Sequence, residues 1–265
     1  MTDRPPEHPP SPPSESTIHN PKSTILSLPG WAQPGDAFRD LLGRVGHPWQ
    51  GVALADLQAE GDALGAAGRE AYTEALARRL EAAEGPVVLV GWSMGGTVAL
   101  EGALARPDRV RGLILINTTA CFPRPPGDPR GQPPRNISAL ALGVRTAPGP
   151  ALFAFWRHAA QPQPPDRDMI RAQVAYAKGL GTEALLHGLD YLRETDLRSR
   201  LGAVAVPTLV LHAEEDRIIP VGAGRELAEG IPNAKLAILP ELGHDAPKLT
   251  PAPLAARIRE ELARW

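Results

Sequence analysis

A serine with a glycine two residues before it and another two residues after it is the strongest candidate for chemistry in the chain. The sequence Gly91-Trp92-Ser93-Met94-Gly95 follows the apolar run 87–90 and precedes a segment of helix formers that extends to Arg106. In a sharp turn from a buried strand into a helix, small residues flank the serine because chain crowds chain, and the hydroxyl is left exposed. This context predicts that Ser93 is a nucleophile. The alternative is a serine that only caps the helix.

A serine hydroxyl is a weak nucleophile at neutral pH, so it needs a base and a carboxylate that orients the base. In this strand–turn–helix context the acid is expected before the histidine in the chain, each just after the carboxyl end of a strand. Asp216 follows the predicted strand 208–212, and His244 follows the predicted strand 235–239. The other six of the seven histidines precede Asp216, so only His244 satisfies this order.

Two other assignments remain open for the acid and the base. Glu214 or Glu215 could replace Asp216 as the acid, because all three lie in one loop. His212 also carries an imidazole, but its position within or at the end of a strand is more typical of a core or supporting residue. Cys121 is not expected to be a nucleophile, since nothing near it in the sequence resembles an activating base.

An oxyanion formed at the reacting carbonyl requires preorganised N–H donors. One is expected from the backbone of Met94, directly after the serine at a helix N-terminus. The other is expected from the backbone of Trp31, in the turn 28–31 after the first strand, where a glycine lets the main chain approach closely. The residues expected to line the substrate pocket are Trp31, Trp92, Cys121 and Phe122. The two indoles could equally be core aromatics.

Strands alternate with helices along most of the chain, which predicts an α/β fold with a mostly parallel central sheet and helices on both faces. The expected strands are 24–28, 51–54, 87–90, 110–116, 208–212 and 235–239, and the expected core helices are 36–45, 69–83, 221–229 and 251–265. Residues 57–68 are rich in glycine and acidic residues and are expected to form a loop.

The expected parts of the chain are a Pro-rich tail at 1–22, a core at 23–120 and 191–265, and a helical lid at 121–190. The tail has almost nothing to bury and should therefore be flexible. Within the lid, 151–158 and 169–189 have helical patterns with no strand between them, which indicates an insertion into the sheet.

The composition excludes several classes of protein. A formal net charge of −2 is not typical of a nucleic-acid-binding protein. A single cysteine excludes an internal disulfide and a cysteine-based zinc cluster. The chain has no apolar run of the roughly 18 residues that a membrane span requires, and its first residues lack the apolar core of a signal peptide. We therefore expect a cytoplasmic, monomeric protein without a metal or a cofactor.

These motifs together resemble those of α/β-hydrolases, over about residues 24–265. Within that superfamily the chain is most similar to the pimeloyl-acyl-carrier-protein methyl ester esterases of biotin synthesis. The segments that carry the resemblance are Gly30-Trp31, Gly91-Trp92-Ser93-Met94-Gly95-Gly96, Cys121-Phe122, 188–198, Asp216 and Gly243-His244. The resemblance implies an α/β-hydrolase fold with a helical lid, and a serine carboxylesterase that removes the methyl ester from a pimeloyl chain through an acyl-enzyme on Ser93.

The resemblance also implies an acidic partner, the acyl-carrier protein, which is held by arginines of the lid. Residues 121–175 contain seven arginines against three aspartates, a net charge of +4 in a chain whose net charge is −2. Arg145 and Arg157 are the expected contacts, although an arginine-rich face could simply be solvated. Two other functions remain open: a generalist short-chain esterase or carbon–carbon hydrolase with the same three residues, and a non-catalytic ligand-binding homologue.

Overall fold

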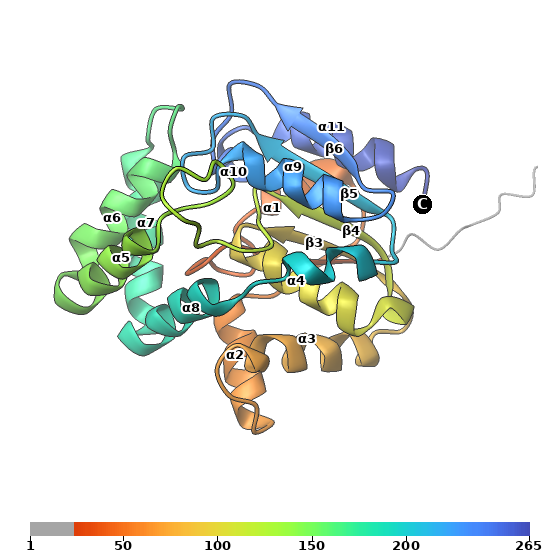
Figure 1. Cartoon of the computed structure of the whole chain (residues 1–265), viewed down its shortest axis with the longest axis horizontal. Helices are drawn as coiled ribbons and strands as arrows, with labels where there is room; N and C mark the ends of the chain where they lie inside the picture. The colour runs from red at the N-terminus through yellow and green to blue at the C-terminus, as the bar shows by residue number, and fades with distance from the viewer. Residues whose placement is uncertain (1–23) are drawn as a thin grey trace, which may run out of the picture.

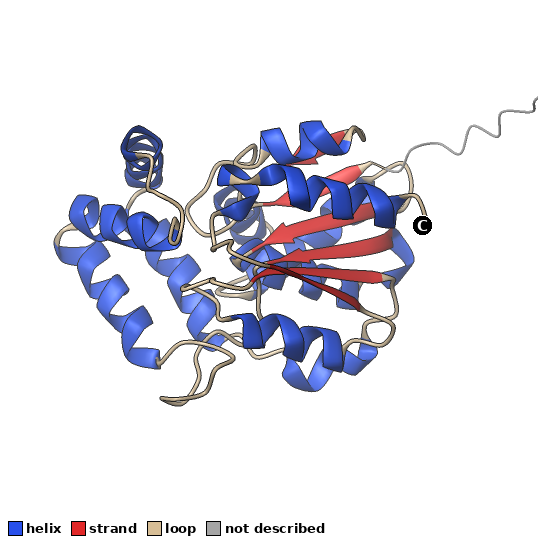
Figure 2. Cartoon of the chain, turned by 90° about the horizontal axis from the view of Figure 1, so that it is seen from above, coloured by secondary structure: helices blue, strands red, loops and turns tan. Residues whose placement is uncertain are grey.

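The computed structural model describes residues 24–265, so the flexible tail predicted at 1–22 lies outside the described residues. A single sheet forms the centre, with helices on both faces and a separate layer of helices at one end (Figures 1 and 2). All neighbouring strands are parallel, in the order β2-β1-β3-β4-β5-β6. The strands are β1 (Ile25–Leu28), β2 (Trp49–Gly51), β3 (Val87–Trp92), β4 (Val110–Ile116), β5 (Thr208–Ala213) and β6 (Lys235–Leu239). The predicted fold class is confirmed.

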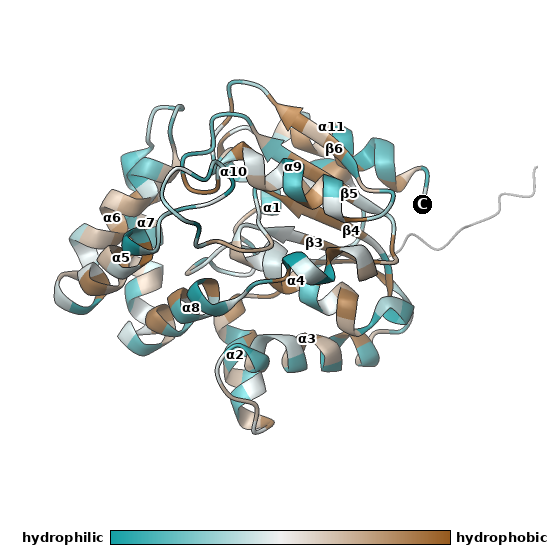
Figure 3. Cartoon of the chain, in the orientation of Figure 1, coloured by the Kyte–Doolittle hydropathy of each residue, from teal (hydrophilic) through white to brown (hydrophobic). Residues whose placement is uncertain are grey.

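The helices of the core follow the strands along the chain. They are α1 (Arg39–Val45), α2 (Leu54–Ala63), α3 (Glu70–Ala82), α4 (Met94–Ala105), α9 (Val221–Gly230), α10 (Ala246–Leu249) and α11 (Pro251–Leu262), with the short 3-10 helices η1 (Pro107–Arg109) and η2 (Arg198–Ala203). Hydrophilic and hydrophobic residues alternate along the ribbons of surface helices such as α3, α9 and α11 (Figure 3). Each of these helices therefore turns an apolar face toward the sheet and a polar face to solvent.

The sheet is covered on both faces, and β3 shows why its sequence is a continuous apolar run. Val87 and Leu89 belong to a buried cluster that includes residues of α3 and α4. Val88 and Val90 point the other way and belong to a second cluster, which includes residues of α1 and α11. Successive side chains of a strand face opposite sides, so a strand buried on both faces needs an apolar residue at every position.

The region around residues 51–68 differs from the prediction of a strand followed by a loop. The strand ends at Gly51, and α2 begins at Leu54 and occupies much of the expected loop. A Cβ atom at Gly61 would overlap the backbone of Ala71 in α3, so the glycine lets two helices pack closely. Gly61, which contributed to the prediction of a loop, is therefore needed for the close packing of α2 against α3.

Four consecutive helices form the layer at the carboxyl end of the sheet, which we call the lid helices. They are α5 (Pro134–Thr146), α6 (Pro148–Ala159), α7 (Arg167–Leu180) and α8 (Thr182–Glu194). They lie together at one end of the molecule, coloured green to cyan in Figure 1. The helix expected at 169–189 is divided at Gly181, whose φ of 84° ends α7. α5 carries Arg145 and lies outside the two helical segments named from the sequence, and α8 extends four residues beyond the predicted lid boundary at 190.

The two ends of the lid insertion lie side by side. Cys121 and Asp196 form an antiparallel bridge, and the backbone N–H of Leu197 donates to the carbonyl of Ala120 at 2.8 Å. The insertion therefore leaves and rejoins the core at one place. The entropic penalty for closing a loop rises only slowly with its length, so a long insertion with adjacent ends is well tolerated.

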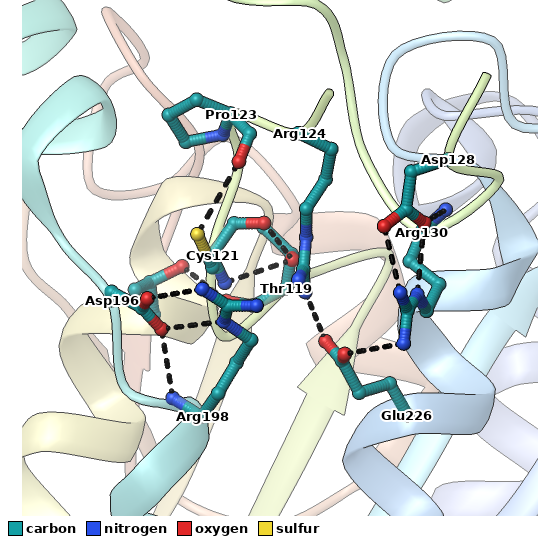
Figure 4. A network of polar contacts seen from close by, with 10 residues as sticks. Thr119, Cys121, Pro123, Arg124, Asp128, Arg130, Asp196, Arg198 and Glu226 are labelled. Carbon is teal, nitrogen blue, oxygen red and sulfur yellow. Dashed lines mark hydrogen bonds and ion pairs between the residues drawn. The ribbon is translucent and has the colours of Figure 1, made fainter. Parts of the chain in front are cut away.

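A buried ion pair fastens the start of the insertion to the core (Figure 4). The Arg124 side chain is only 2% exposed and donates to the carboxylate of Glu226 on α9. Glu226 also lies 3.5 Å from the guanidinium of Arg130, which pairs with Asp128. Removing one partner of a buried pair is strongly destabilising, because it leaves the other charge buried and uncompensated.

We expect Glu226→Ala to lower the free energy of unfolding by about 3 kcal/mol, because Arg124 would stay buried without its counter-charge. Urea unfolding followed by circular dichroism measures the change. The control is Glu229→Ala, which removes an exposed carboxylate from the same helix and should change the free energy by less than about 0.5 kcal/mol. Equal effects of the two substitutions would contradict the role of the ion pair.

Candidate active site

Ser93 occupies a strained turn between β3 and α4. Its φ of 56° and ψ of −127° lie in a region that residues with a side chain rarely adopt. Its backbone N–H donates to the carbonyl of Ile116 at 3.0 Å, and a Cβ atom at Gly91 would lie 2.5 Å from the carbonyl oxygen of Gly95. Glycines are thus required on both sides of the serine, because the turn brings main chain against main chain.

A hydrogen-bonded chain connects Ser93 to His244 and Asp216, which come from three separate loops. The Ser93 Oγ lies 3.0 Å from His244 Nε2, and His244 Nδ1 lies 2.7 Å from Asp216 Oδ2. Since a carboxylate only accepts, Nδ1 carries the proton and Nε2 is left to accept from the serine hydroxyl. All three residues are buried. The side chains of Glu214 and Glu215 are exposed, so Asp216 is the carboxylate that the fold brings to the histidine.

The Asp216 carboxylate is held by its own loop. Its Oδ1 accepts from the backbone N–H groups of Ile218 and Ile219, each at 2.8 Å, which leaves Oδ2 for the imidazole. Hydrogen bonds from backbone N–H groups stabilise the charged form of a carboxylate. These two bonds therefore fix the orientation of the Asp216 carboxylate.

The loop that carries His244 is tied to the end of the sheet by two side chains. The carbonyl oxygen of His244 accepts from the Trp92 indole Nε1 at 3.1 Å and from Asn117 Nδ2 at 2.9 Å. Asn117 Oδ1 in turn accepts from the backbone N–H of Ala213 at 2.8 Å. The Trp92 ring packs against the imidazole, with ring centroids 5.7 Å apart. Trp92 therefore supports the histidine from below and does not line the cavity, which differs from its predicted position.

Asn117 is a site residue that was missed in the sequence. It has a φ of 45°, a conformation that asparagine tolerates better than most residues. The sequence places Asn117 directly after β4. In the sheet, β4 lies between β3, which ends just before Ser93, and β5, which ends near Asp216. A polar residue at this carboxyl edge is well placed to connect neighbouring loops.

His212 lies on β5 next to Asp216. It is fully buried, with Nε2 2.9 Å from the carbonyl oxygen of Ile219 and 3.9 Å from Asp216 Oδ2. Burial lowers the pKa of this imidazole, and this effect outweighs the attraction of the nearby carboxylate. His212 is therefore neutral at pH 7. It lies beside Asp216, but its Nε2 is nearer to the carbonyl oxygen of Ile219 than to the carboxylate, so it is not the base of the hydrogen-bonded chain.

The turn 28–31 lies directly against Ser93. A Cβ atom at Gly30 would be 3.3 Å from Ser93 Cβ, and one at Gly95 would overlap the carbonyl oxygen of Pro29. Both predicted oxyanion donors, the N–H groups of Trp31 and Met94, belong to segments that meet at this point. Within the described residues, neither N–H donates to a main-chain carbonyl of a turn or loop.

A largely apolar cavity of about 420 Å³ opens above Ser93 and beneath the lid helices. Its apolar wall includes Trp31, Phe122, Ile137, Leu140, Phe155 and Leu189. Its polar lining, besides Ser93, consists of Gln132, Asn136, His158 and Arg217. Cys121 is not part of the lining: it is buried beside the cavity, and its thiol contacts the carbonyl of Pro123 at 3.4 Å.

Arg145 and Arg157 are exposed on α5 and α6, and neither lines the cavity above Ser93. Neither forms an ion pair with another residue of the range 24–265. In that same range, no three His, Cys, Asp or Glu side chains are grouped in a way that could hold a metal ion. None of the described helices is long and apolar enough to cross a membrane.

Comparisons with known proteins agree with this geometry. A family model described as alpha/beta hydrolase fold matches residues 79–249. The pimeloyl-[acyl-carrier protein] methyl ester esterase of Chromobacterium violaceum is 31% identical over 83% of this chain and 86% of that protein. The enzyme of the same name from Nitrosomonas europaea is 28% identical over 83% and 88%. An esterase structure from Exiguobacterium antarcticum has a TM-score of 0.77 at 20% identity, covering 91% of this chain and 92% of that one.

The buried state of His212 predicts a pH dependence of stability. The pKa of His212 is lowered in the folded protein, so below its usual value of 6.5 the unfolded chain binds a proton that the folded protein does not. This contribution therefore reduces stability as the pH falls below 6.5. His212→Gln, which cannot titrate, should reduce the loss of unfolding free energy between pH 7 and pH 5 by about 1 kcal/mol.

The measurement is urea unfolding at both pH values. His158→Gln, which removes an exposed imidazole instead of a buried one, is the control with which the pH dependence of His212→Gln is compared. The same pH dependence in the wild type and in His212→Gln would show that the buried imidazole is protonated in the folded protein.

Proposed function

The chain belongs to the α/β-hydrolase family and is a carboxylic ester hydrolase, and from this we propose that it hydrolyses the methyl ester of pimeloyl-acyl-carrier protein in biotin biosynthesis. The observation that carries the proposal is the hydrogen-bonded chain Ser93–His244–Asp216, whose serine lines a largely apolar cavity. The relatives named pimeloyl-[acyl-carrier protein] methyl ester esterase support the choice of substrate, because they match most of the chain.

The proposed reaction has two halves. Ser93 Oγ attacks the carbonyl carbon of the methyl ester while His244 Nε2 takes the hydroxyl proton, and Asp216 stabilises the imidazolium that forms. The imidazolium then gives this proton to the departing methoxide, so methanol leaves and the acyl group stays on Ser93. A water molecule repeats the sequence: it gives a proton to His244, attacks the acyl carbon and releases the carboxylate and Ser93.

Two main-chain N–H groups, from Trp31 and Met94, are proposed to hold the oxyanion. Met94 is the first residue of α4, whose N-terminal N–H groups have no partner within the helix. Donors fixed in place before the reaction need no reorganisation when charge develops, and losing one typically slows turnover by about 10²-fold. The close packing of residues 29–31 against Ser93 supports this assignment.

The cavity suits a seven-carbon acyl chain with a second polar end. An extended chain of this length spans roughly 7 Å, at about 3.5 Å for every three bonds. Its methylene groups would lie along the apolar wall. At its other end, the thioester carbonyl and the amides of the carrier's prosthetic arm would meet polar groups of the lining, such as Asn136, His158 and Arg217. The polarity of the walls therefore supports a substrate of this kind.

The acidic carrier protein is proposed to dock on the lid helices. The exposed and unpaired Arg145 and Arg157 lie there, in a segment whose net charge is positive. A cluster of one charge raises the rate of encounter with an oppositely charged partner, and salt weakens the effect. Both residues stand outside the cavity, so their contribution is to association and not to the chemical step.

Ser93→Ala should reduce hydrolysis of the methyl ester by at least about 10⁴-fold, because the nucleophile is removed. The measurement is release of methanol or free acid from the carrier-bound methyl ester. The melting temperature should stay within a few degrees of the wild type, which separates loss of chemistry from loss of fold. Retained turnover in the folded variant would reject the assignment of the nucleophile.

The double substitution Arg145→Glu with Arg157→Glu tests the carrier. At low ionic strength it should lower kcat/KM for the carrier-bound ester by about tenfold, and leave kcat/KM for free dimethyl pimelate unchanged. Arg257→Glu, on the core helix α11, is the matched control and should leave both values unchanged. If the wild type shows no preference for the carrier-bound ester, the chain is a generalist esterase.

A further inference from the structure

The indole of Trp31 is held by lid helix α8, more than 150 residues away in the sequence. Its Nε1 donates a buried hydrogen bond of 2.9 Å to the carbonyl oxygen of Leu185. One turn further along α8, a Cβ atom at Gly188 would lie 2.6 Å from Trp31 Cδ1 and 2.9 Å from Nε1. The indole therefore rests against the bare backbone of the helix, at a position where only glycine leaves room.

The same point on α8 also meets the residue of the second proposed oxyanion donor. A Cβ atom at Gly188 would be 3.5 Å from the Sδ atom of Met94. On another side, Phe155 of α6 packs its ring edgewise against Trp31, with centroids 5.4 Å apart and planes at 89°. The side chains of Trp31 and Met94, the two residues proposed to supply the oxyanion donors, are thus both packed against Gly188 of the lid.

Helix α8 is itself fixed to the core. The Tyr191 hydroxyl donates to the Glu101 carboxylate on α4 at 2.7 Å, and the bond is buried. Thr73 of α3 donates to the same carboxylate oxygen at 3.0 Å. Burial, together with the adjacent carboxylate, raises the pKa of Tyr191 well above its usual value of 10.0, so the hydroxyl stays a donor at neutral pH. The helix can therefore serve as a rigid support.

We propose that α8 sets the position of the Trp31 main-chain N–H, and that Leu185, through its carbonyl, and Gly188 are positioning residues of the oxyanion hole. The inference rests on the oxyanion role proposed for Trp31. Stabilisation of an oxyanion requires donors held within a few tenths of an ångström, which a turn alone supplies poorly. A glycine within a helix destabilises it by about 1 kcal/mol relative to alanine, so its presence here is consistent with a need for space.

Gly188→Ala tests the proposal, because the added methyl group must displace the indole. For a free methyl ester, kcat should fall by about 10²-fold while KM changes by less than about threefold. A trifluoromethyl ketone, which forms a reversible hemiketal with Ser93 as the serine proton passes to His244, should bind about 10²-fold more weakly. The matching methyl ketone, which lacks this activation, should bind as it does to the wild type.

Gly179→Ala is the matched control. Gly179 is a helical glycine of α7, and a Cβ atom there would have no neighbour within 4 Å. Both substitutions raise helix propensity equally, so they differ in the contacts that the new methyl group makes with Trp31 and Met94. Gly179→Ala should retain wild-type kcat and wild-type affinity for both ketones.

Trp31→Phe provides a second variant, should Gly188→Ala not fold. It keeps an aromatic ring and removes the donor to Leu185, so kcat and the affinity for the trifluoromethyl ketone should fall together by about tenfold. Unchanged affinity for the trifluoromethyl ketone in a folded Gly188→Ala or Trp31→Phe protein would overturn the positioning role. Absence of ester hydrolysis in the wild type would instead reject the proposed function.

Discussion

The buried hydrogen bond between Asp216 and His244 is the interaction on which the site depends. A carboxylate in a dry environment is stable only when its oxygen atoms are occupied, and here two backbone N–H groups and the imidazole occupy them. With Nδ1 committed to Asp216, the other imidazole nitrogen must face outward as an acceptor, and Ser93 lies in that direction. The tautomer and the orientation of the ring therefore follow from one carboxylate, as does the direction of proton transfer under the proposed function.

The sheet supplies the second constraint, because parallel strands bring their carboxyl ends to one edge. Ser93, Asn117 and Asp216 all come from loops that leave this edge, from strands that are neighbours in the sheet. Hydrogen bonds from the side chains of Trp92 and Asn117 then bring the loop of His244 into line with them. The geometry of the site is thus built by main-chain packing first and fixed afterwards by a few polar side chains.

Positions that depend on a place directly after a strand could be predicted from the sequence, and positions that depend on tertiary contacts could not. The placement of Ser93, Asp216 and His244 belongs to the first group, because strand pattern and chain order can both be read along the sequence. Gly61 and Gly188 belong to the second group. The sequence alone does not distinguish a glycine that lets a helix or a ring approach closely from a glycine in a loop. Proline was misleading in the lid, where α5 and α6 each begin with a proline whose missing N–H is tolerated at that position, whereas the helix predicted from Pro251 is present as α11.

The lid helices divide into two parts with different physical character. α8 is attached to the core by the buried hydrogen bond between Tyr191 and Glu101, and it accepts a hydrogen bond from the indole of Trp31. A shift of α8 would therefore disturb both hydrogen bonds. α5 and α6 instead present exposed arginines that make no ion pair within the described residues. Under the proposed function, partner recognition and support of the reacting centre therefore lie on separate helices. Charges on α5 and α6 can then change, and partner preference with them, while the donors around Ser93 keep their positions.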